Sequence, residues 1–374
     1  MGHSVLFITN SFRTCNGVAT VLMNQYQALI DAGYKVDILQ FWDIDSVYAE
    51  RVRKNGGNVI TYKILSSKLD NIRKIKEFYK DHTYDIVHIN HTDLIAAMFI
   101  WCAKEAHVPV IVYHSHNTKL LGGLKRNLKS TIYDYLCVKG ANLYLACSKR
   151  AGEDVFKNKR FTILHNAIAI DKFKFNNENR KKIRKELNIN ENDLVIGTVC
   201  RYAEQKNPIF MYEIFSEILK KNSNAIFLWV GSAASEEDPI VRQMKLTAKK
   251  LKIEEKLRLV GSKDDVYNWY SAMDVFLMPS KWEGLGITYI ESQANGLPTF
   301  ASDVVPDDAK VTALFKSISL NETPEAWAKQ ICKCKIRNKE NVVDYKQDIV
   351  DKGYDITKTN AELLKIYQNK LGEN

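Results

Sequence analysis

The chain has 374 residues, of which 45% are hydrophobic and 26% are charged. This balance is typical of a globular protein that buries sizeable cores, and it excludes a fibrous or disordered chain. At about 100–200 residues per domain, the length predicts two or three domains. The longest apolar run, 94–103, is ten residues long, about half of what a bilayer span requires.

Cysteine usage and the N-terminus both indicate a cytoplasmic protein. The seven cysteines are scattered and odd in number, which fits a reducing compartment better than a disulfide framework. The first residues lead directly into an apolar segment, without the basic start and cleavage site of a secretory signal.

The net charge of +10 is unevenly distributed. Residues 118–160 contain ten basic residues and only three acidic ones. A solvated basic surface is the simplest interpretation of this segment, and an anionic membrane surface is the alternative. The chain has no zinc finger, RNA-recognition signature or basic heptad region, so no nucleic-acid partner is expected.

Short apolar segments rich in β-branched residues alternate with longer helical patterns. The first half is expected to contain a helix over 18–32 and strands over 4–9, 35–40, 58–62, 85–90, 108–114, 142–147 and 161–164. After a charged stretch, 176–193, further strands are expected over 194–200, 225–230, 257–260, 275–278 and 299–301. This β-α-β alternation predicts parallel sheets covered by helices.

The pattern predicts an α/β protein of two Rossmann-like domains, 1–170 and 171–350. Residues 351–374 are expected to hold a helix that packs back on the first domain; their apolar positions at helical spacing are Ala361, Leu364, Ile366 and Tyr367. Ligands of open parallel sheets lie at the carboxyl ends of the strands. Two such domains facing each other would leave a cleft there.

The strongest site signal is the segment 279–298. Gly284 and Gly286 precede an expected helix, and glycines at a helix entrance let backbone N–H groups approach an anion. Glu283 and Glu291 flank this entrance and would suit the hydroxyls of a sugar and a ribose on either side of a diphosphate. Taken singly, Glu283 is better explained as an acid stabilised by the helix N-terminus, and Glu291 as an exposed helix residue; the coincidence of the glycines, the helix ends and the spacing favours a site.

The Glu-x7-Glu spacing in EGLGITYIESQANGLP resembles the signature of the retaining glycosyltransferases of family 4, which have the GT-B fold. A second element, 197–207, resembles the one that places an arginine and a lysine on the donor diphosphate. Here these residues are Arg201 and Lys206. Both cations can form charge-assisted hydrogen bonds to phosphate oxygens and stabilise a departing nucleotide.

The resemblance extends along most of the chain and implies a set of site residues. The implied catalytic residues are His114, His116, Arg201, Lys206 and Glu283. The implied donor-binding residues are Gly17, Arg201, Lys206, Gly231, Val260, Glu283, Gly284, Leu285, Gly286 and Glu291. The implied acceptor-binding residues are His116, Asn117 and Lys119. Two departures from the family pattern are Cys200, where glycine is usual, and His165-Asn166 at the domain junction.

The resemblance implies an enzyme that moves a sugar from a nucleoside diphosphate donor, with uridine as the expected base, to a sugar or polyprenyl-linked acceptor with retention. Capsule or exopolysaccharide synthesis is the implied pathway. No metal or other cofactor is expected, because Asp43 and Asp45 lie too early in the chain for a metal-binding DxD, and His88 and His91 lack a zinc-site pattern. We expect a cytoplasmic enzyme with peripheral attachment to the inner face of the membrane. The alternatives are a UDP-sugar 2-epimerase of the same fold and a non-catalytic nucleotide-sugar-binding protein.

Overall fold

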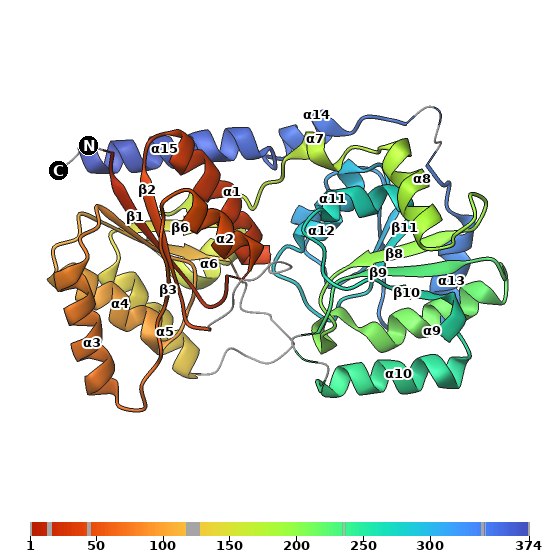
Figure 1. Ribbon diagram of the computed structural model, residues 1–374, viewed down its shortest axis with the longest axis horizontal. Coiled ribbons are helices and arrows are strands. Elements are labelled where there is room, and N and C mark those ends of the chain that lie inside the picture. Colours follow the sequence, from red (N-terminus) through yellow and green to blue (C-terminus); the bar gives the residue numbers. More distant parts are fainter. Residues whose placement is uncertain are drawn as a thin grey trace. The chain divides into compact units, whose positions relative to one another are not determined.

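The computed structural model describes residues 2–12, 17–42, 46–116, 128–233, 235, 237–337, 340 and 342–372. The chain divides into two compact units (Figure 1). The first unit comprises Met1–Ala167 with Ile356–Asn374, and the second comprises Ile168–Asp355. Each unit has a parallel sheet with helices on its faces, so the α/β class and the two parallel sheets expected from the sequence are confirmed.

The sheet of the first unit has the strand order β3-β2-β1-β4-β5-β6-β7. Its strands are β1 (Ser4–Thr9), β2 (Lys35–Gln40), β3 (Val59–Thr61), β4 (Ile86–Ile89), β5 (Val110–Ser115), β6 (Leu143–Ala146) and β7 (Thr162–Ile163). The helices of this unit are α1 (Gly17–Asp31), α2 (Val47–Lys54), α3 (Lys68–Asp81), α4 (Leu94–Glu105), α5 (Leu128–Gly140), α6 (Lys149–Phe156) and α15 (Ile356–Gly372).

Alternation along β1 shows how this sheet buries both faces. Leu6 and Ile8 point into a core cluster that includes Phe99 of α4. Val5 and Phe7, which point to the opposite face, belong to a second cluster with α1 and α15. Figure 1 shows α4 and α5 on one side of the sheet and α1 and α15 on the other. Both faces are apolar because helices cover both, as in other parallel sheets.

The terminal helix α15 is built into the first unit. The side chains of Leu363 and Tyr367 are buried in the cluster on the α1 side of the sheet. Of the apolar positions expected to pack, Ala361 is exposed, whereas Leu363, which the sequence analysis did not select, is buried.

The sheet of the second unit has the order β10-β9-β8-β11-β12-β13. Its strands are β8 (Val195–Val199), β9 (Ile226–Val230), β10 (Leu257–Leu259), β11 (Val275–Met278), β12 (Thr299–Ser302) and β13 (Phe315–Ile318). The α-helices are α7 (Ile170–Phe173), α8 (Asn177–Glu186), α9 (Pro208–Leu219), α10 (Pro239–Leu251), α11 (Val266–Trp269), α12 (Ile287–Ala294), α13 (Pro324–Lys333) and α14 (Lys346–Asp351). Short 3-10 turns are η2 (Glu204–Lys206), η3 (Glu254–Lys256), η4 (Tyr270–Ala272) and η5 (Asp307–Ala309).

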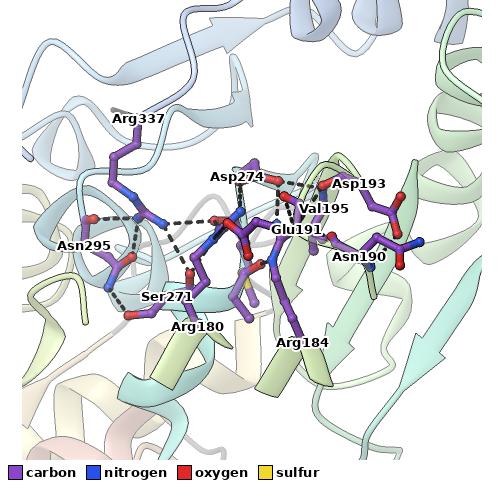
Figure 2. A network of polar contacts seen from close by, with 12 residues as sticks. Arg180, Arg184, Asn190, Glu191, Asp193, Val195, Ser271, Asp274, Asn295 and Arg337 are labelled. Atoms are coloured by element: carbon purple, nitrogen blue, oxygen red, sulfur yellow. Dashed lines mark hydrogen bonds and ion pairs between the residues drawn. The ribbon is translucent and has the colours of Figure 1, made fainter. Parts of the chain in front are cut away.

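The charged stretch 176–193 is part of the second unit. Most of it forms α8, which has the fully buried side chains of Arg180 and Arg184 on one face. Both guanidinium groups donate to Asp274, at 2.9 and 2.7 Å, just before β11 begins. Figure 2 shows this network at the amino end of β8 and β11. These ion pairs hold α8 against the sheet.

A third arginine joins this network from the segment after α13. Arg337 donates to the carbonyl oxygens of Asn295, at 2.8 Å, and of Met273, at 3.1 Å (Figure 2). Its guanidinium also lies 4.0 Å from the ring centroid of Phe175. Burial, with the nearby Arg180 cation, lowers the pKa of Arg337 to about 9. Asp274 is therefore the buried counter-charge for several cations.

Replacement of Asp274 by alanine should destabilise the second unit strongly. The change would leave Arg180 and Arg184 buried without their carboxylate, and breaking a buried pair in this way typically costs about 3–5 kcal/mol. Chemical denaturation of D274A measures the loss. The control is E191A, because the Glu191 side chain is 50% exposed and bonds Arg180 only at 3.4 Å, so it should cost less than about 1 kcal/mol. Equal, small losses in both variants would contradict this role of Asp274.

Candidate active site

The carboxyl ends of adjacent strands in the second unit bring the sequence-predicted donor residues to one edge. In the order β10, β9, β8 and β11, the strands end just before Val260, Gly231, Arg201 and the loop that contains Glu283. All these strand pairs are parallel, so the loops that follow them emerge on the same side. This edge is where open α/β sheets bind their ligands.

The two diagnostic sequence elements contact each other directly. The Nζ atom of Lys206, after β8, lies 2.5 Å from Oε1 of Glu283, after β11. Ser280 donates to the same carboxylate oxygen at 2.7 Å. The backbone N–H of Lys281 donates to the carbonyl of Gln205 at 2.8 Å, which joins the two loops a second time. Residues 77 positions apart in sequence thus form one cluster.

Lys206 and Arg201 have N–H groups that could form hydrogen bonds to a ligand. An ammonium group has three N–H donors, of which Glu283 takes one from Lys206. Arg201 is exposed, and its side chain has no hydrogen bond or ion pair with the part of the chain that the structure describes. On Glu283, Oε2 receives a 3.4 Å contact from Gln205 and no other hydrogen bond from the described residues, so this oxygen can accept a further hydrogen bond.

Close backbone packing fixes the loop after β8. The indole N–H of Trp229 donates to the carbonyl of Cys200 at 2.8 Å. A Cβ atom on Gly231 would lie 2.1 Å from that same carbonyl oxygen, and Gly231 has a φ of +137°. Burial raises the pKa of the Cys200 thiol to about 11, so this cysteine is neutral and serves no nucleophilic role. Arg201 therefore lies at the carboxyl edge of the second sheet even though cysteine, and not glycine, precedes it.

The glycine loop leads into helix α12 through a backbone conformation that requires glycine. Gly286 has a φ of +75°, and a Cβ atom there would lie 2.5 Å from the ring of Tyr289. The N-cap residue of α12 is Gly286, which has no side chain to cap the helix; its carbonyl accepts from the N–H of Tyr289 at 2.9 Å, and the N–H groups of Ile287 and Thr288 have no partner within the helix. Gly284 lies in the same loop, whereas the side chain of Leu285 is buried in the core, which leaves only its backbone for ligand contact.

Glu291 lies inside this unit and is not an exposed helix acid. It is 4% exposed, and its Oε2 atom accepts a hydrogen bond from the Tyr270 hydroxyl at 2.5 Å. Burial raises the pKa of Glu291 to about 7, although the hydrogen bond from Tyr270 opposes this effect. The carboxyl group is therefore protonated more readily than an exposed glutamate.

The two candidate histidines occupy different depths in the first unit. His114 lies within β5 and is fully enclosed; its Nδ1 is 3.1 Å from Nε2 of His88. The other ring nitrogen of His88 contacts the hydroxyl of Tyr367 in α15. His116 directly follows β5 at the carboxyl edge. Both side chains are buried; His114 lies within β5, and His116 lies just past its carboxyl end.

Two asparagines hold His116. Its Nε2 lies 2.8 Å from Oδ1 of Asn90, and its Nδ1 lies 3.2 Å from Oδ1 of Asn166. Burial lowers the pKa of His116 to about 4, so the ring is neutral and has one donor and one acceptor nitrogen. The Asn90 nitrogen donates to the His88 carbonyl at 3.3 Å, which orients the Asn90 oxygen toward the His116 ring.

Of the remaining sequence-predicted site residues, Gly17 is the one that lies within the described residues. Gly17 is the first residue of α1 in the first unit, with open space beside its Cα. Asn117, Lys119 and the Asp43/Asp45 pair lie outside the described residues. Within the described ranges, no group of three His, Cys, Asp or Glu side chains is arranged to hold a metal ion.

Sequence reasoning missed the residues that support the predicted ones. Ser280 and Gln205 bond Glu283, Tyr270 bonds Glu291, and Asn90 and Asn166 bond His116. Ser280 and Gln205 lie within the two sequence motifs, so their positions in the sequence could have identified them as candidate site residues. Tyr270 and Asn90 come from other segments and have no such signal.

Family models match both halves of the chain. Residues 15–172 match the model described as Glycosyltransferase Family 4, and residues 179–347 match the one described as Glycosyl transferases group 1. Together these matches span most of both units, and the chain belongs to glycosyltransferase family 4.

Curated relatives agree with this assignment. The chain is 26% identical to the glycosyltransferase EpsF of Bacillus subtilis over 94% of this chain and 93% of that protein. It is 24% identical to the UDP-Gal:alpha-D-GlcNAc-diphosphoundecaprenol alpha-1,3-galactosyltransferase of Escherichia coli, over 82% of each chain. It is also 24% identical to the capsular polysaccharide biosynthesis glycosyltransferase CapH of Staphylococcus aureus, over 79% of this chain and 80% of that one. The homologues thus include enzymes of polysaccharide biosynthesis.

Solved structures share the fold over the whole chain. HepE of Anabaena, solved in complex with UDP and glucose, superposes with a TM-score of 0.80 at 17% identity, over 98% of this chain and 100% of that one. A structure described as a UDP-N-acetylglucosamine 2-epimerase from Listeria monocytogenes superposes with a TM-score of 0.67 at 15% identity, covering 100% of this chain and 98% of the other. The fold is therefore GT-B, a fold also adopted by proteins of the epimerase type.

Glu291 should make the stability of the second unit depend on pH. Its pKa, about 7 in the folded protein, exceeds its ordinary value of 4.5, so the folded state binds more protons and this contribution to stability falls as pH rises. The Glu291→Gln variant keeps an acceptor for Tyr270 and has no charge to bury. Its stability relative to the parent should rise by about 2–3 kcal/mol between pH 5 and pH 8. Urea unfolding at both pH values measures this difference, and a difference that does not change with pH would contradict the assignment.

Proposed function

We propose that this glycosyltransferase moves a hexose from a UDP-linked donor to a hydroxyl of a saccharide or lipid-linked acceptor, with retention of configuration, in capsule or exopolysaccharide synthesis. The observation that carries the proposal is the Lys206–Glu283 cluster beside Arg201 at the sheet edge. The Escherichia coli relative, named for a UDP-galactose donor and a diphosphoundecaprenol acceptor, supports the donor and acceptor classes. HepE, solved with UDP, supports the nucleotide.

The two cations would bind the donor diphosphate. Arg201 supplies a planar set of donors, and Lys206 supplies the N–H groups that Glu283 does not use. The N-terminus of α12 beyond Gly286 adds backbone N–H groups and the positive end of the helix dipole. As the bond between the sugar and the diphosphate breaks, negative charge grows on the leaving phosphate, and these fixed donors stabilise it.

The acids would orient the rest of the donor. Oε2 of Glu283 has capacity to accept from a hydroxyl of the donor sugar. Glu291 would accept from the ribose, and its contact with Tyr270 would then orient the carboxylate. His116, neutral and held by two asparagines, would lie on the acceptor side with Asn117 and Lys119, donating to or accepting from a sugar hydroxyl.

Loss of either cation should slow sugar transfer by about 10²–10³-fold, as does removal of one oxyanion donor elsewhere. Arg201→Ala is the cleaner variant, because Arg201 is exposed, whereas Lys206→Ala also leaves Glu283 without its counter-ion. Transfer from UDP-glucose, UDP-galactose and UDP-N-acetylglucosamine to lipid-linked acceptors, followed by mass spectrometry, gives the rates. Lys220→Ala, an exposed lysine paired with Glu217, is the matched control and should keep the parental rate. Parental rates in R201A would contradict the role of Arg201.

The same assay separates the proposal from its alternatives. No metal ion takes part in the proposed chemistry, so the rate should be unchanged in EDTA. A UDP-sugar 2-epimerase would convert the donor without any acceptor and without net transfer. A non-catalytic binding protein would bind UDP-sugars and produce neither product.

We also propose reversible docking of the first unit on an anionic membrane. The part of the chain that the structure describes has no helix long and apolar enough to cross a bilayer. Ile132 and Tyr135 of α5 are 47% and 60% exposed, and Trp101 of α4, 39% exposed, donates to a backbone carbonyl of α5 at 3.1 Å. Lys104 and Lys139 lie over the rings of Trp101 and Tyr135. Exposed apolar side chains with two lysines beside them provide the apolar burial and the electrostatic attraction that interfacial binding needs.

Flotation with vesicles tests the docking surface. Vesicles of phosphatidylglycerol and phosphatidylcholine should carry the protein upward at low salt and release it at high salt, because the lysines act through screened charges. The double variant I132S/Y135S should bind about tenfold more weakly, since burial of its apolar side chains is lost. Leu246→Ser, which removes an equally exposed side chain from α10 in the second unit, is the control. Salt-insensitive binding, or equal binding by all variants, would contradict the proposal.

A further inference from the structure

A row of side chains follows the carboxyl edge of the first sheet beyond His116. In the strand order β2, β1, β4 and β5, the residues just past the strand ends are Trp42, Asn10, His91 and His116. All these strand pairs are parallel, so the four residues emerge on the same side of the sheet. The sequence analysis selected only His116 from this row.

Trp42 is the unusual member of the row. It is 62% exposed, although the residue before it, Phe41, is buried. Its indole N–H donates to Oδ1 of Asn10 at 3.1 Å, and the backbone N–H of Phe41 donates to the Asn10 carbonyl at 3.2 Å. The ring is therefore held by its polar edge on a neighbouring strand while much of its surface stays in water.

Among the described residues, the polar side chain bonded to the Trp42 ring is Asn10, which is itself exposed. Farther along the edge, past β4, the imidazole of His91 lies 2.9 Å from the carboxylate of Asp93. An exposed indole with a polar neighbour suits a ligand that has both an apolar face and hydroxyl groups. A sugar ring, which has an apolar C–H face and a rim of hydroxyls, matches both features, because its C–H groups pack on the electron-rich face of an indole.

We infer that Trp42 is a stacking platform for a pyranose ring of the acceptor. The inference rests on the proposed glycosyltransferase function. It adds a minimum length for the acceptor. Trp42 follows β2 and His116 follows β5, three strand positions away in the sheet. At about 4.8 Å per strand, the two positions are roughly 14 Å apart, farther than one pyranose ring reaches. The sugar on Trp42 is thus a neighbour of the one that reacts, and the acceptor carries at least two sugars.

Saturation-transfer NMR with soluble saccharides tests this platform. The probes are methyl β-lactoside, methyl β-maltoside, methyl β-cellobioside and, for comparison, methyl β-glucoside, each added to full-length protein saturated with UDP so that the donor site is filled. At least one disaccharide should receive saturation on its ring C–H protons. Trp42→Ala should weaken that binding about tenfold, whereas Trp42→Phe, which keeps an aromatic face, should retain most of it.

Leu69→Ala is the control, because Leu69 is an apolar side chain of comparable exposure, 73%, on α3 of the same unit and belongs to none of the proposed binding surfaces. It should bind the disaccharide as the parent does. Equal binding by parent and W42A, loss in L69A as well, or no saturation of any disaccharide would overturn the inference. Calorimetric titration with UDP is run first, and failure to bind UDP would count against the proposed function itself. If the protein binds UDP but replacement of Trp42 leaves disaccharide binding unchanged, only the role of Trp42 is ruled out.

Discussion

The ion pair between Lys206 and Glu283 is the contact on which the donor site depends. It can form because β8 and β11 are neighbours in the second sheet, so the loops after them leave the edge side by side. A nearly buried carboxylate and an ammonium each need a partner, and each satisfies the other. Within the part of the chain that the structure describes, the pair leaves two lysine N–H groups and one carboxylate oxygen for a ligand, near the exposed side chain of Arg201 and the start of α12.

The two ends of the second unit's sheet differ: the amino end holds a buried ionic network, and the carboxyl end carries the candidate donor site. At the amino end, Asp274 joins Arg180 and Arg184 of α8 in a buried network, which anchors the start of β8 and β11 (Figure 2). At the carboxyl end, glycines with positive φ allow close backbone approach around Cys200 and Tyr289. The first unit repeats this division: α15 packs Tyr367 beneath the histidines, and the sheet edge presents His116 and Trp42.

Sequence patterns predicted most of the strands because buried parallel strands are runs of β-branched and aromatic residues. They missed β13, in which Lys316 and Ser317 are exposed between two buried positions. The sequence also did not show that the charged stretch 176–193 contributes buried arginines, because the partner of Arg184 is Asp274, 90 residues away. The motifs placed Glu283 and Lys206 correctly in one cluster, but which of two neighbouring histidines reaches the edge, and that Tyr270 bonds Glu291, depend on tertiary contacts that spacing does not encode.

A crystal structure of the protein soaked with a UDP-sugar would show directly where the donor binds. We predict that the pyrophosphate lies within hydrogen-bond distance of Lys206 and Arg201 and of the backbone N–H groups after Gly286, with the sugar against Glu283. A diphosphate bound away from the edge formed by β8 and β11, or one that leaves Lys206 paired only with Glu283, would rule out this donor site.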